Sequence, residues 1–452
     1  MLESILVFVF ATILGIFTGL MPGFGGLAAM AISYPLLVTL EPHNVLIFYI
    51  VLISIDQYYN GLTAIIFGVP GSSYNIPSVI EGHALFKQGM GGETVVYSAI
   101  SSWICSLFAI LFILLLMPFM FYVYKIWTTE AQIIIFMIMF LSLIFVSNNN
   151  IFVNATLFFI GIILGQIGYD HTTGTQFLTF DSPILFDGLP IMCVVTALLV
   201  VPVLLKSYLN ESEPIRWVYL NTAIYKKLFL TIVKSKKLTI LRSGVIGSLG
   251  GFIPGLSYAA SSLIAYSTEK AIQIKNKTYR KGSVNCLIAS EGSNNAGALT
   301  QLVPLLFLGI PITASEALIY NILEQKGVII SFDWFVSTFW LALSCFILSS
   351  TLGLLIAGKY INLLKILNGI KIRTLYIYVL FILLGSLYFM GSQTNSGLEY
   401  LFLTICLVPF GILLRNFDTS PLLYGFFLHE TIFFTLDRFF VLYNFNINIR
   451  IF

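Results

Sequence analysis

The chain has 452 residues, of which 58% are hydrophobic and only 10% charged, and its mean hydropathy is +0.95. Soluble domains are usually about 25% charged, so this composition excludes a water-soluble globular protein and indicates a surface that faces lipid. The net charge of +3 gives no indication of nucleic-acid binding. An outer-membrane barrel is excluded too, because its strands alternate apolar and polar residues in segments of about ten.

Continuous apolar stretches recur along the whole chain. The clearest cover residues 5–20, 45–67, 98–124, 133–146, 151–167, 335–357, 375–390 and 400–414. Counting less regular segments, we predict about ten to twelve transmembrane or re-entrant helical segments. The predicted fold class is therefore an all-α polytopic protein of the cell (inner) membrane. The first stretch lacks a basic start and a small-residue cleavage site, so we expect a retained helix and not a signal peptide.

A Pro-Gly pair, Pro22-Gly23, interrupts the first apolar stretch and is followed by Gly25 and Gly26. A break in an apolar helix predicts a re-entrant segment, because exposed backbone at membrane depth is tolerated only against protein or a wet cavity.

Asp56 stands inside the apolar run 45–67. An ionisable group at that depth is costly and by default predicts a functional site, so Asp56 is a candidate for cation coupling. The alternative is a structural carboxyl that an aqueous cavity or the hydroxyls of Tyr58 and Tyr59 satisfy.

The same run ends in Gly68-Val-Pro70-Gly71-Ser72-Ser73, which predicts a broken helix near residues 68–73. A helix that starts after this break would offer free backbone N–H groups and two serine hydroxyls to an anion.

Basic residues concentrate between residues 206 and 242 and again between 270 and 281. Both clusters are predicted to face the cytoplasm, so the segment 243–269 must enter the membrane and return. Pro254-Gly255 divides it into two arms of roughly 17–21 Å at 1.5 Å per residue, and neither can cross a core of about 30 Å. We predict a re-entrant hairpin whose tip lies near the bilayer centre.

The second half of the chain repeats the breaks of the first half. The pattern G-x3-G-x2-P-G occurs at residues 15–23 and 247–255, and Gly68-Val-Pro70 corresponds to Gly309-Ile-Pro311. We predict two membrane repeats, residues 1–205 and 243–452, joined by a basic cytoplasmic connection at 206–242. The breaks lie near residues 22–23, 68–73, 254–255 and 309–313. Corresponding breaks in two halves indicate the binding site of a secondary transporter, and an inverted repeat is the favoured orientation.

We predict that the four breaks converge on substrate carboxylates. The motif segments contain no lysine or arginine, so helix N-termini, hydroxyls and amides would have to bind the anion. The candidate substrate-binding residues are Pro22, Gly23, Gly25, Gly26, Asn60, Gly68, Pro70, Gly71, Ser72, Ser73, Pro254, Gly255, Ser257, Asn294, Asn295, Pro311 and Thr313. The alternative is that the small residues only let helices pack closely.

Glu291 precedes Asn294 and Asn295, which we expect to open the element running to Pro311. Amide oxygens suit a hard cation, so Asp56, Glu291 and Asn295 are the candidates for coupling to Na⁺ or H⁺. Glu291 has two alternatives, a counter-charge and an interfacial charge that complements a helix dipole. Beyond Na⁺ we predict no metal or cofactor, because the five cysteines are scattered without metal-ligand spacing.

Together these motifs resemble the large membrane subunit of the tripartite tricarboxylate transporter family, the TctA type, over nearly the whole chain. Further matching segments are Glu81-Gly-His-Ala-Leu-Phe-Lys-Gln-Gly, Gly168-Tyr-Asp-His-Thr-Thr-Gly-Thr-Gln-Phe, Phe186-Asp-Gly-Leu-Pro, Ala289-Ser-Glu-Gly-Ser-Asn-Asn-Ala and Pro421-Leu-Leu-Tyr-Gly-Phe-Phe-Leu-His-Glu. The resemblance implies a cation-coupled permease that works with a small membrane subunit and a periplasmic solute-binding protein delivering carboxylates such as citrate. The chain departs from the family pattern at residues 56–61 and at Ile312, where glycines are usual.

Other functions are weighed against this one. An intramembrane enzyme should show a clustered catalytic set, and a channel a repeated filter; the sequence shows neither. A degenerate permease kept as a scaffold, or a stand-alone permease for a different solute, stays an open alternative because the departures fall near the predicted site. Alternating access by an elevator-like movement and a homo-oligomeric state are further expectations.

Overall fold

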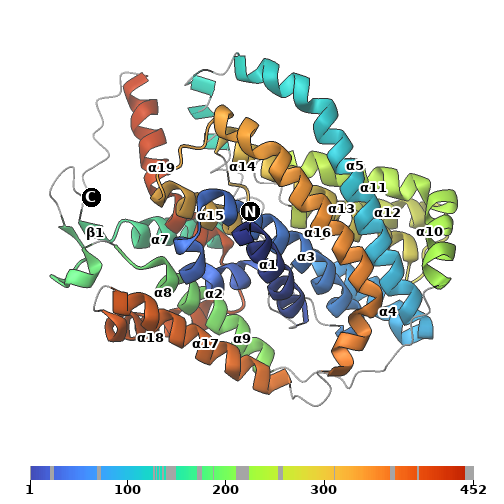
Figure 1. Ribbon diagram of the computed structural model, residues 1–452, viewed down its shortest axis with the longest axis horizontal. Helices are drawn as coiled ribbons and strands as arrows, with labels where there is room; N and C mark the ends of the chain where they lie inside the picture. Colours follow the sequence, from blue (N-terminus) through green and yellow to red (C-terminus); the bar gives the residue numbers. More distant parts are fainter. Residues whose placement is uncertain are drawn as a thin grey trace.

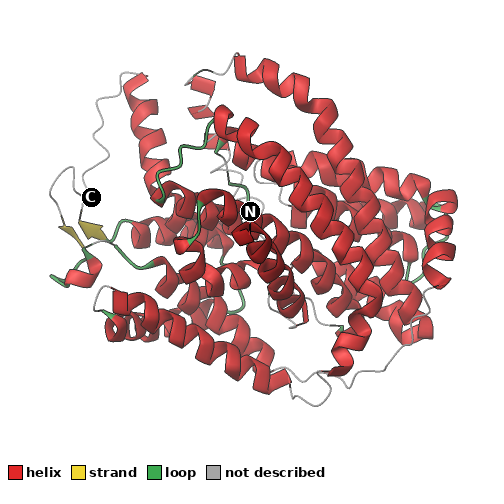
Figure 2. Cartoon of the chain, in the orientation of Figure 1, coloured by secondary structure: helices red, strands yellow, loops and turns green. Residues whose placement is uncertain are grey.

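The computed structural model describes residues 2–20, 25–68, 73–125, 149–169, 176–186, 188–209, 223–252, 258–309, 311–366, 372–393 and 396–442, with scattered positions between 128 and 138. These residues are almost entirely helical (Figure 2). Within these ranges the strands are β1 (Gly168–Tyr169) and β2 (Gln176–Phe177), a short antiparallel pair. The predicted all-α class is confirmed.

The first half of the chain contributes these helices: α1 (Leu2–Leu20), α2 (Gly26–Thr39), α3 (Pro42–Phe67), α4 (His83–Leu85), α5 (Gly91–Lys125), α7 (Ile151–Gly165), α8 (Ile191–Val195) and α9 (Val201–Leu209). Short 3-10 and π-helical turns complete it: η1 (Ser73–Asn75), η2 (Ser78–Gly82), η3 (Phe86–Met90), η4 (Pro183–Leu185) and η5 (Thr196–Val200).

The second half contributes these helices: α10 (Ala223–Ser235), α11 (Lys237–Phe252), α12 (Tyr258–Lys275), α13 (Val284–Thr300), α14 (Leu302–Leu308), α15 (Ala314–Gln325), α16 (Phe332–Ile366), α17 (Ile372–Gln393), α18 (Gly397–Leu414) and α19 (Ser420–Leu442). The helix α11 begins at Lys237, six residues before the boundary expected at 243, so the basic connection runs directly into it.

Five stretches of the described residues are long and apolar enough to cross a membrane. They are Leu2–Gly19, Pro42–Phe67, Ser78–Tyr122, Phe332–Ala357 and Gly397–Leu414. Shorter apolar helices include α2 and α7.

Two helices form the centre of the molecule. Every residue of α3 from Asn44 to Phe67 is buried, and so is every residue of α13 from Cys286 to Thr300. A helix buried on all sides belongs to the core. The helix α3 contacts α1, α5 and α16, whereas α13 contacts α5, α11 and α12, and the two central helices also touch each other (Figure 1).

The G-x3-G motif of each half lies where a helix crosses one of these central helices. A Cβ on Gly19 of α1 would overlap Tyr59 of α3, and a Cβ on Gly251 of α11 would overlap Thr300 of α13. Glycine permits this close approach of two backbones. Both motifs therefore perform the same packing role in the two halves.

The glycine of each G-x-P motif ends a helix. Gly68 closes α3 with a φ of 70°, and Gly309 closes α14 with a φ of 68°. Their N–H groups donate to Ala64 O at 2.9 Å and Leu305 O at 3.0 Å. Because a left-handed cap favours glycine, this local geometry explains why both motifs keep that residue.

Replacing Gly251 with valine is expected to destabilise the protein by about 1–3 kcal/mol, because the side chain must displace α11 from α13. Thermal unfolding of the purified protein in detergent measures the change. Gly385→Val in α17 is the matched control, because nothing lies within 4 Å of a Cβ there. An equal effect of the two substitutions would show that the crossing does not need the glycine.

Candidate functional site

Part of the predicted site lies outside the described residues. The predicted residues concerned are Pro22, Gly23, Pro70, Gly71, Ser72, Pro254, Gly255 and Ser257, and only the backbone of Ser73 is described. The elements that flank each break are described, and the remaining candidates lie on them.

Asp56 lies in the middle of α3 and is only 1% exposed. Its carboxylate accepts hydrogen bonds from Asn60 Nδ2 (2.8 Å), Thr18 Oγ1 (3.0 Å) and Tyr74 OH (3.3 Å). The backbone of Gly26, the first residue of α2, is a further hydrogen-bond partner. The N-cap residue Gly25 has no side chain that could accept a hydrogen bond from the first N–H groups of α2. The Asp56 carboxylate serves as that acceptor, and its negative charge complements the helix dipole.

The hydroxyls of Tyr58 and Tyr59 were the alternative partners of Asp56. They contact α16 instead: Tyr58 OH lies 2.7 Å from Ser350 Oγ, and Tyr59 OH donates to Gly353 O at 3.3 Å. Tyr58 is two positions from Asp56 and so points to another side of the helix, whereas the i+4 residue Asn60 shares its face and is the partner.

Glu291 lies in the middle of α13 and is 2% exposed. It accepts hydrogen bonds from Ser78 of η2 and from Ser98 of α5, the latter at 3.0 Å. On its third side is Gly61 of α3, where a Cβ would lie 2.5 Å from Glu291 Oε2. The helix begins seven residues earlier, at Val284, so the interpretation as an interfacial charge at a helix start is wrong. Asn294 and Asn295 likewise lie inside α13 and do not open a new element.

Each central helix carries an acid followed four residues later by an asparagine. Asn60 Nδ2 donates to Asp56, and Asn295 Nδ2 donates to the carbonyl of Glu291 at 3.1 Å. In both side chains the amide oxygen is buried, and it has no hydrogen-bond partner among the described residues. Buried acceptors are rarely left unpaired, and the bonded nitrogen fixes which end of the amide faces the open position.

Four other amides have both polar atoms unpaired within the described structure, and they are Gln57, Asn75, Asn294 and Gln301. The turn η1 contacts α3, α12 and α13. Tyr74, next to Asn75, packs on Tyr258 with 5.3 Å between ring centroids, and its carbonyl accepts from Ser262 Oγ at 3.0 Å. The turn η1, the start of α12 and the helix α13 thus lie against one another.

The start of α15, with Pro311 and Thr313, is organised differently from the expectation. Glu316 Oε2 accepts from the N–H groups of Ile312 (2.6 Å) and Thr313 (3.0 Å), and Thr313 Oγ1 accepts from the N–H of Glu316 (3.3 Å). These reciprocal bonds form a capping box. The N–H groups proposed for a substrate carboxylate are therefore already bound by a carboxylate of the chain. The Thr-x-x-Glu spacing after Pro311 is the sequence signal that could have predicted this capping box.

Glu81 of η2 lies against the start of α13 and is fully buried. It accepts from the N–H groups of Gly282 (2.7 Å) and Ser283 (2.9 Å) and from the hydroxyls of Tyr279 (2.9 Å) and Tyr266 (3.2 Å). Burial and the hydrogen-bonded Glu81 carboxylate raise the pKa of Tyr279 to about 12, so this phenol stays protonated and donates. A residue of the first half thus fixes the start of α13.

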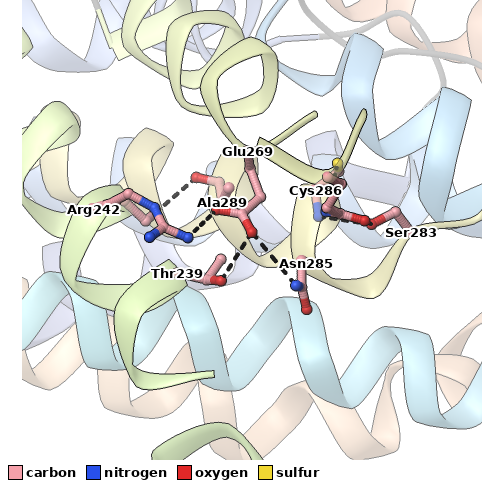
Figure 3. A network of polar contacts seen from close by, with 9 residues as sticks. Thr239, Arg242, Glu269, Ser283, Asn285, Cys286 and Ala289 are labelled. Atoms are coloured by element: carbon pink, nitrogen blue, oxygen red, sulfur yellow. Dashed lines mark hydrogen bonds and ion pairs between the residues drawn. The ribbon is translucent and has the colours of Figure 1, made fainter. Parts of the chain in front are cut away.

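A second network joins the start of α11, the end of α12 and the start of α13 (Figure 3). Arg242 Nη2 lies 2.6 Å from Glu269 Oε2, and Glu269 Oε1 accepts from Thr239 (3.2 Å) and Asn285 (3.4 Å).

The buried residues of the described part include five acids but no lysine or arginine, so the core is strongly acidic.

Glu81→Ala is expected to destabilise the protein by about 3 kcal/mol or more, because it leaves buried donors at the start of α13 without an acceptor. Glu93→Ala, an exposed acid at the start of α5, should change stability little. Thermal unfolding of both variants is the measurement. Equal stability of the two would contradict a fixing role for Glu81.

Comparison with known proteins agrees with these observations. The tripartite tricarboxylate transporter TctA family matches residues 5–423. An uncharacterized 52.8 kDa protein in the TAR-I ttuC' 3' region of Agrobacterium vitis is 24% identical over 422 residues, which cover 92% of this chain and 83% of that protein. An uncharacterized protein in the TAR-II ttuC' 3' region of the same organism is 35% identical over 82 residues, 18% of this chain and 34% of that protein. No solved structure matches the chain. The chain belongs to the TctA family of tripartite tricarboxylate transporters, and it is a multi-pass membrane protein of the permease type.

Proposed function

We propose that this chain is the permease subunit of a binding-protein-dependent secondary active transporter. It takes up tricarboxylates or related organic acids across the inner membrane, together with a coupling cation. A periplasmic solute-binding protein delivers the substrate, and a small membrane subunit completes the complex. Membership of a tripartite family supports both partners.

Two repeats, residues 1–205 and 243–452, form the transport machinery, and the connection 206–242 joins them. Three local features support this repeat: the paired helix crossings at Gly19 and Gly251, the paired left-handed caps at Gly68 and Gly309, and the acid-x3-Asn pairs on α3 and α13. Inverted hairpins that carry the breaks would expose the site to each membrane face in turn by an elevator-like movement.

The substrate carboxylates bind at the breaks near 70–73 and 254–257. The other two helix starts are less suitable, because Asp56 bonds the start of α2 and Glu316 the start of α15. The Nδ2 groups of Asn75 and Asn294 are buried and have no partner among the described residues, and they suit a carboxylate oxygen.

The coupling cation binds beside Glu291, with the amide oxygens of Asn60 and Asn295 as neutral ligands. These two unpaired, buried oxygens are the single observation that carries the proposal, because a hard cation prefers oxygen ligands. Asp56 is the weaker candidate, because four described groups already donate to its carboxylate, whereas Ser78 and Ser98 are the described donors to Glu291. A cation next to Glu291 also neutralises a buried charge that would otherwise repel an anionic substrate.

The test is uptake of labelled carboxylates into proteoliposomes that contain the complete complex, with and without the binding protein and with imposed Na⁺ or pH gradients. Uptake that needs both the binding protein and one gradient is the expected result. Absence of uptake across a broad panel of acids would reject the carboxylate substrate and favour a different solute or a scaffold. The strongly acidic core is the observation that favours such a different solute.

Glu291→Gln is expected to abolish gradient-driven uptake while leaving substrate binding to the solute-binding protein unchanged, because the amide keeps the shape but removes the charge that holds the cation. Uptake rates measured at increasing Na⁺ or decreasing pH check it. Glu399→Gln, an exposed acid of α18, is the control. Unchanged cation dependence in Glu291→Gln would exclude Glu291 as the coupling site.

A further inference from the structure

Glu316 uses only one of its two carboxylate oxygens. Oε2 caps α15 by accepting from the N–H groups of Ile312 and Thr313. Oε1 is buried and has no hydrogen-bond partner within the described structure, and the residue is 0% exposed. A buried carboxylate oxygen that lacks both a donor and a positive charge is costly at membrane depth.

Tyr49 of α3 presents a second unpartnered oxygen to the same turn. The residue is 0% exposed, and its hydroxyl has no hydrogen-bond partner among the described residues. Its charged neighbour is Glu316, and the hydroxyls of Ser315 and Thr313 are its close polar neighbours. Carboxylate, phenol and alcohol oxygens therefore meet at the start of α15.

The groups that face this cluster from the other elements are all neutral or acidic. Tyr258 of α12 interacts electrostatically with Glu316, and so does Tyr424 of α19, which lies near Asp418 as well. Tyr424 also donates a hydrogen bond to Ile312 O. On α2, Tyr34 donates to Gln325 at the opposite end of α15. The described residues thus supply oxygen ligands here but no lysine or arginine.

The cap itself does not require the charge of Glu316. A capping box works with glutamine as well as with glutamate, because the N-cap N–H needs only an acceptor. The carboxylate therefore offers something that glutamine cannot, a negative charge with one free oxygen beside a buried phenol.

We propose that Glu316 Oε1, the Tyr49 hydroxyl and Ser315 Oγ bind a monovalent cation, either Na⁺ or a proton, at the start of α15. This inference rests on the proposed cation-coupled transport and adds a second cation position to it. The two positions are separate: Glu291 meets α3 at Gly61 and Glu316 meets it at Tyr49, roughly 18 Å apart along the helix at 1.5 Å per residue. A cation bound at this position connects the start of α15 in the second half of the chain with the central helix α3 of the first half.

The direct test compares the wild-type chain with Glu316→Gln, which keeps the cap and removes the charge. Thermal unfolding in detergent is followed while NaCl replaces choline chloride at constant ionic strength, and again in choline chloride at decreasing pH. A cation that binds the folded chain raises its unfolding temperature. In Glu316→Gln we expect the concentration for half of this rise to increase about tenfold or more, because a charged ligand becomes neutral. The control on the same helix, Glu324→Gln, lies at an exposed position and should behave as wild type.

Tyr49→Phe and Ser315→Ala test the site independently, in case Glu316→Gln does not fold. Each removes one neutral oxygen and should weaken the response to the same cation without abolishing it. If all three variants keep the wild-type response, the proposal is overturned.

Uptake assays on the same variants separate this inference from the transport proposal. If wild-type unfolding responds to a cation through Glu316 but uptake needs no cation, the site stands and the coupling proposal fails. If uptake is cation-coupled and neither uptake nor unfolding depends on Glu316, the coupling proposal stands and the second site is rejected.

Discussion

Buried carboxylates held at the starts of helices organise this protein. Asp56 bonds the start of α2, Glu81 the start of α13 and Glu316 the start of α15. Glu269 pairs with the partly exposed Arg242; for these three acids, backbone N–H groups and helix dipoles compensate the negative charge. Two of these acids come from a helix other than the one they bond, so each also sets where two elements meet.

Glu291 differs from these three acids because its described hydrogen-bond donors are side-chain hydroxyls and not backbone N–H groups. Its neighbours are the hydroxyls of Ser78 and Ser98 and the glycine at position 61. Hydroxyls can donate or accept, so they suit a carboxylate whose charge state changes when a cation or proton arrives. The contrast explains why the same residue type can be structural at one position and serve coupling at another.

The sequence predicted features that depend on local chemistry. The apolar runs identified α3 and α16, and the Gly/Pro punctuation identified the helix ends at Gly68 and Gly309. The two G-x3-G motifs each mark a close crossing, of α1 with α3 and of α11 with α13, and the repeat stays a prediction. Asp56 stood out because a lone charge in an apolar run is visible without any partner.

Contacts between distant segments could not be predicted in this way. The partners of Glu291 come from η2 and α5, about 200 positions earlier in the chain, and one sequence gives no indication of such pairs. The prediction that Asn294 and Asn295 open an element is wrong, because burial of α13 against α3, α11 and α12 lets the helix continue through them. The sequence did not indicate a role for Glu316, because an acid in the first turn of a helix is common.

The central claim is that a cation binds at the interface of α3 and α13, between Glu291 and the amide oxygens of Asn60 and Asn295. The most direct measurement is an anomalous difference map from crystals of the complex in which Tl⁺ replaces Na⁺. The account predicts a peak within coordination distance of the Glu291 carboxylate and at least one of the two amide oxygens. A map with bound Tl⁺ only elsewhere, or with a direct hydrogen bond filling each amide oxygen, would contradict it.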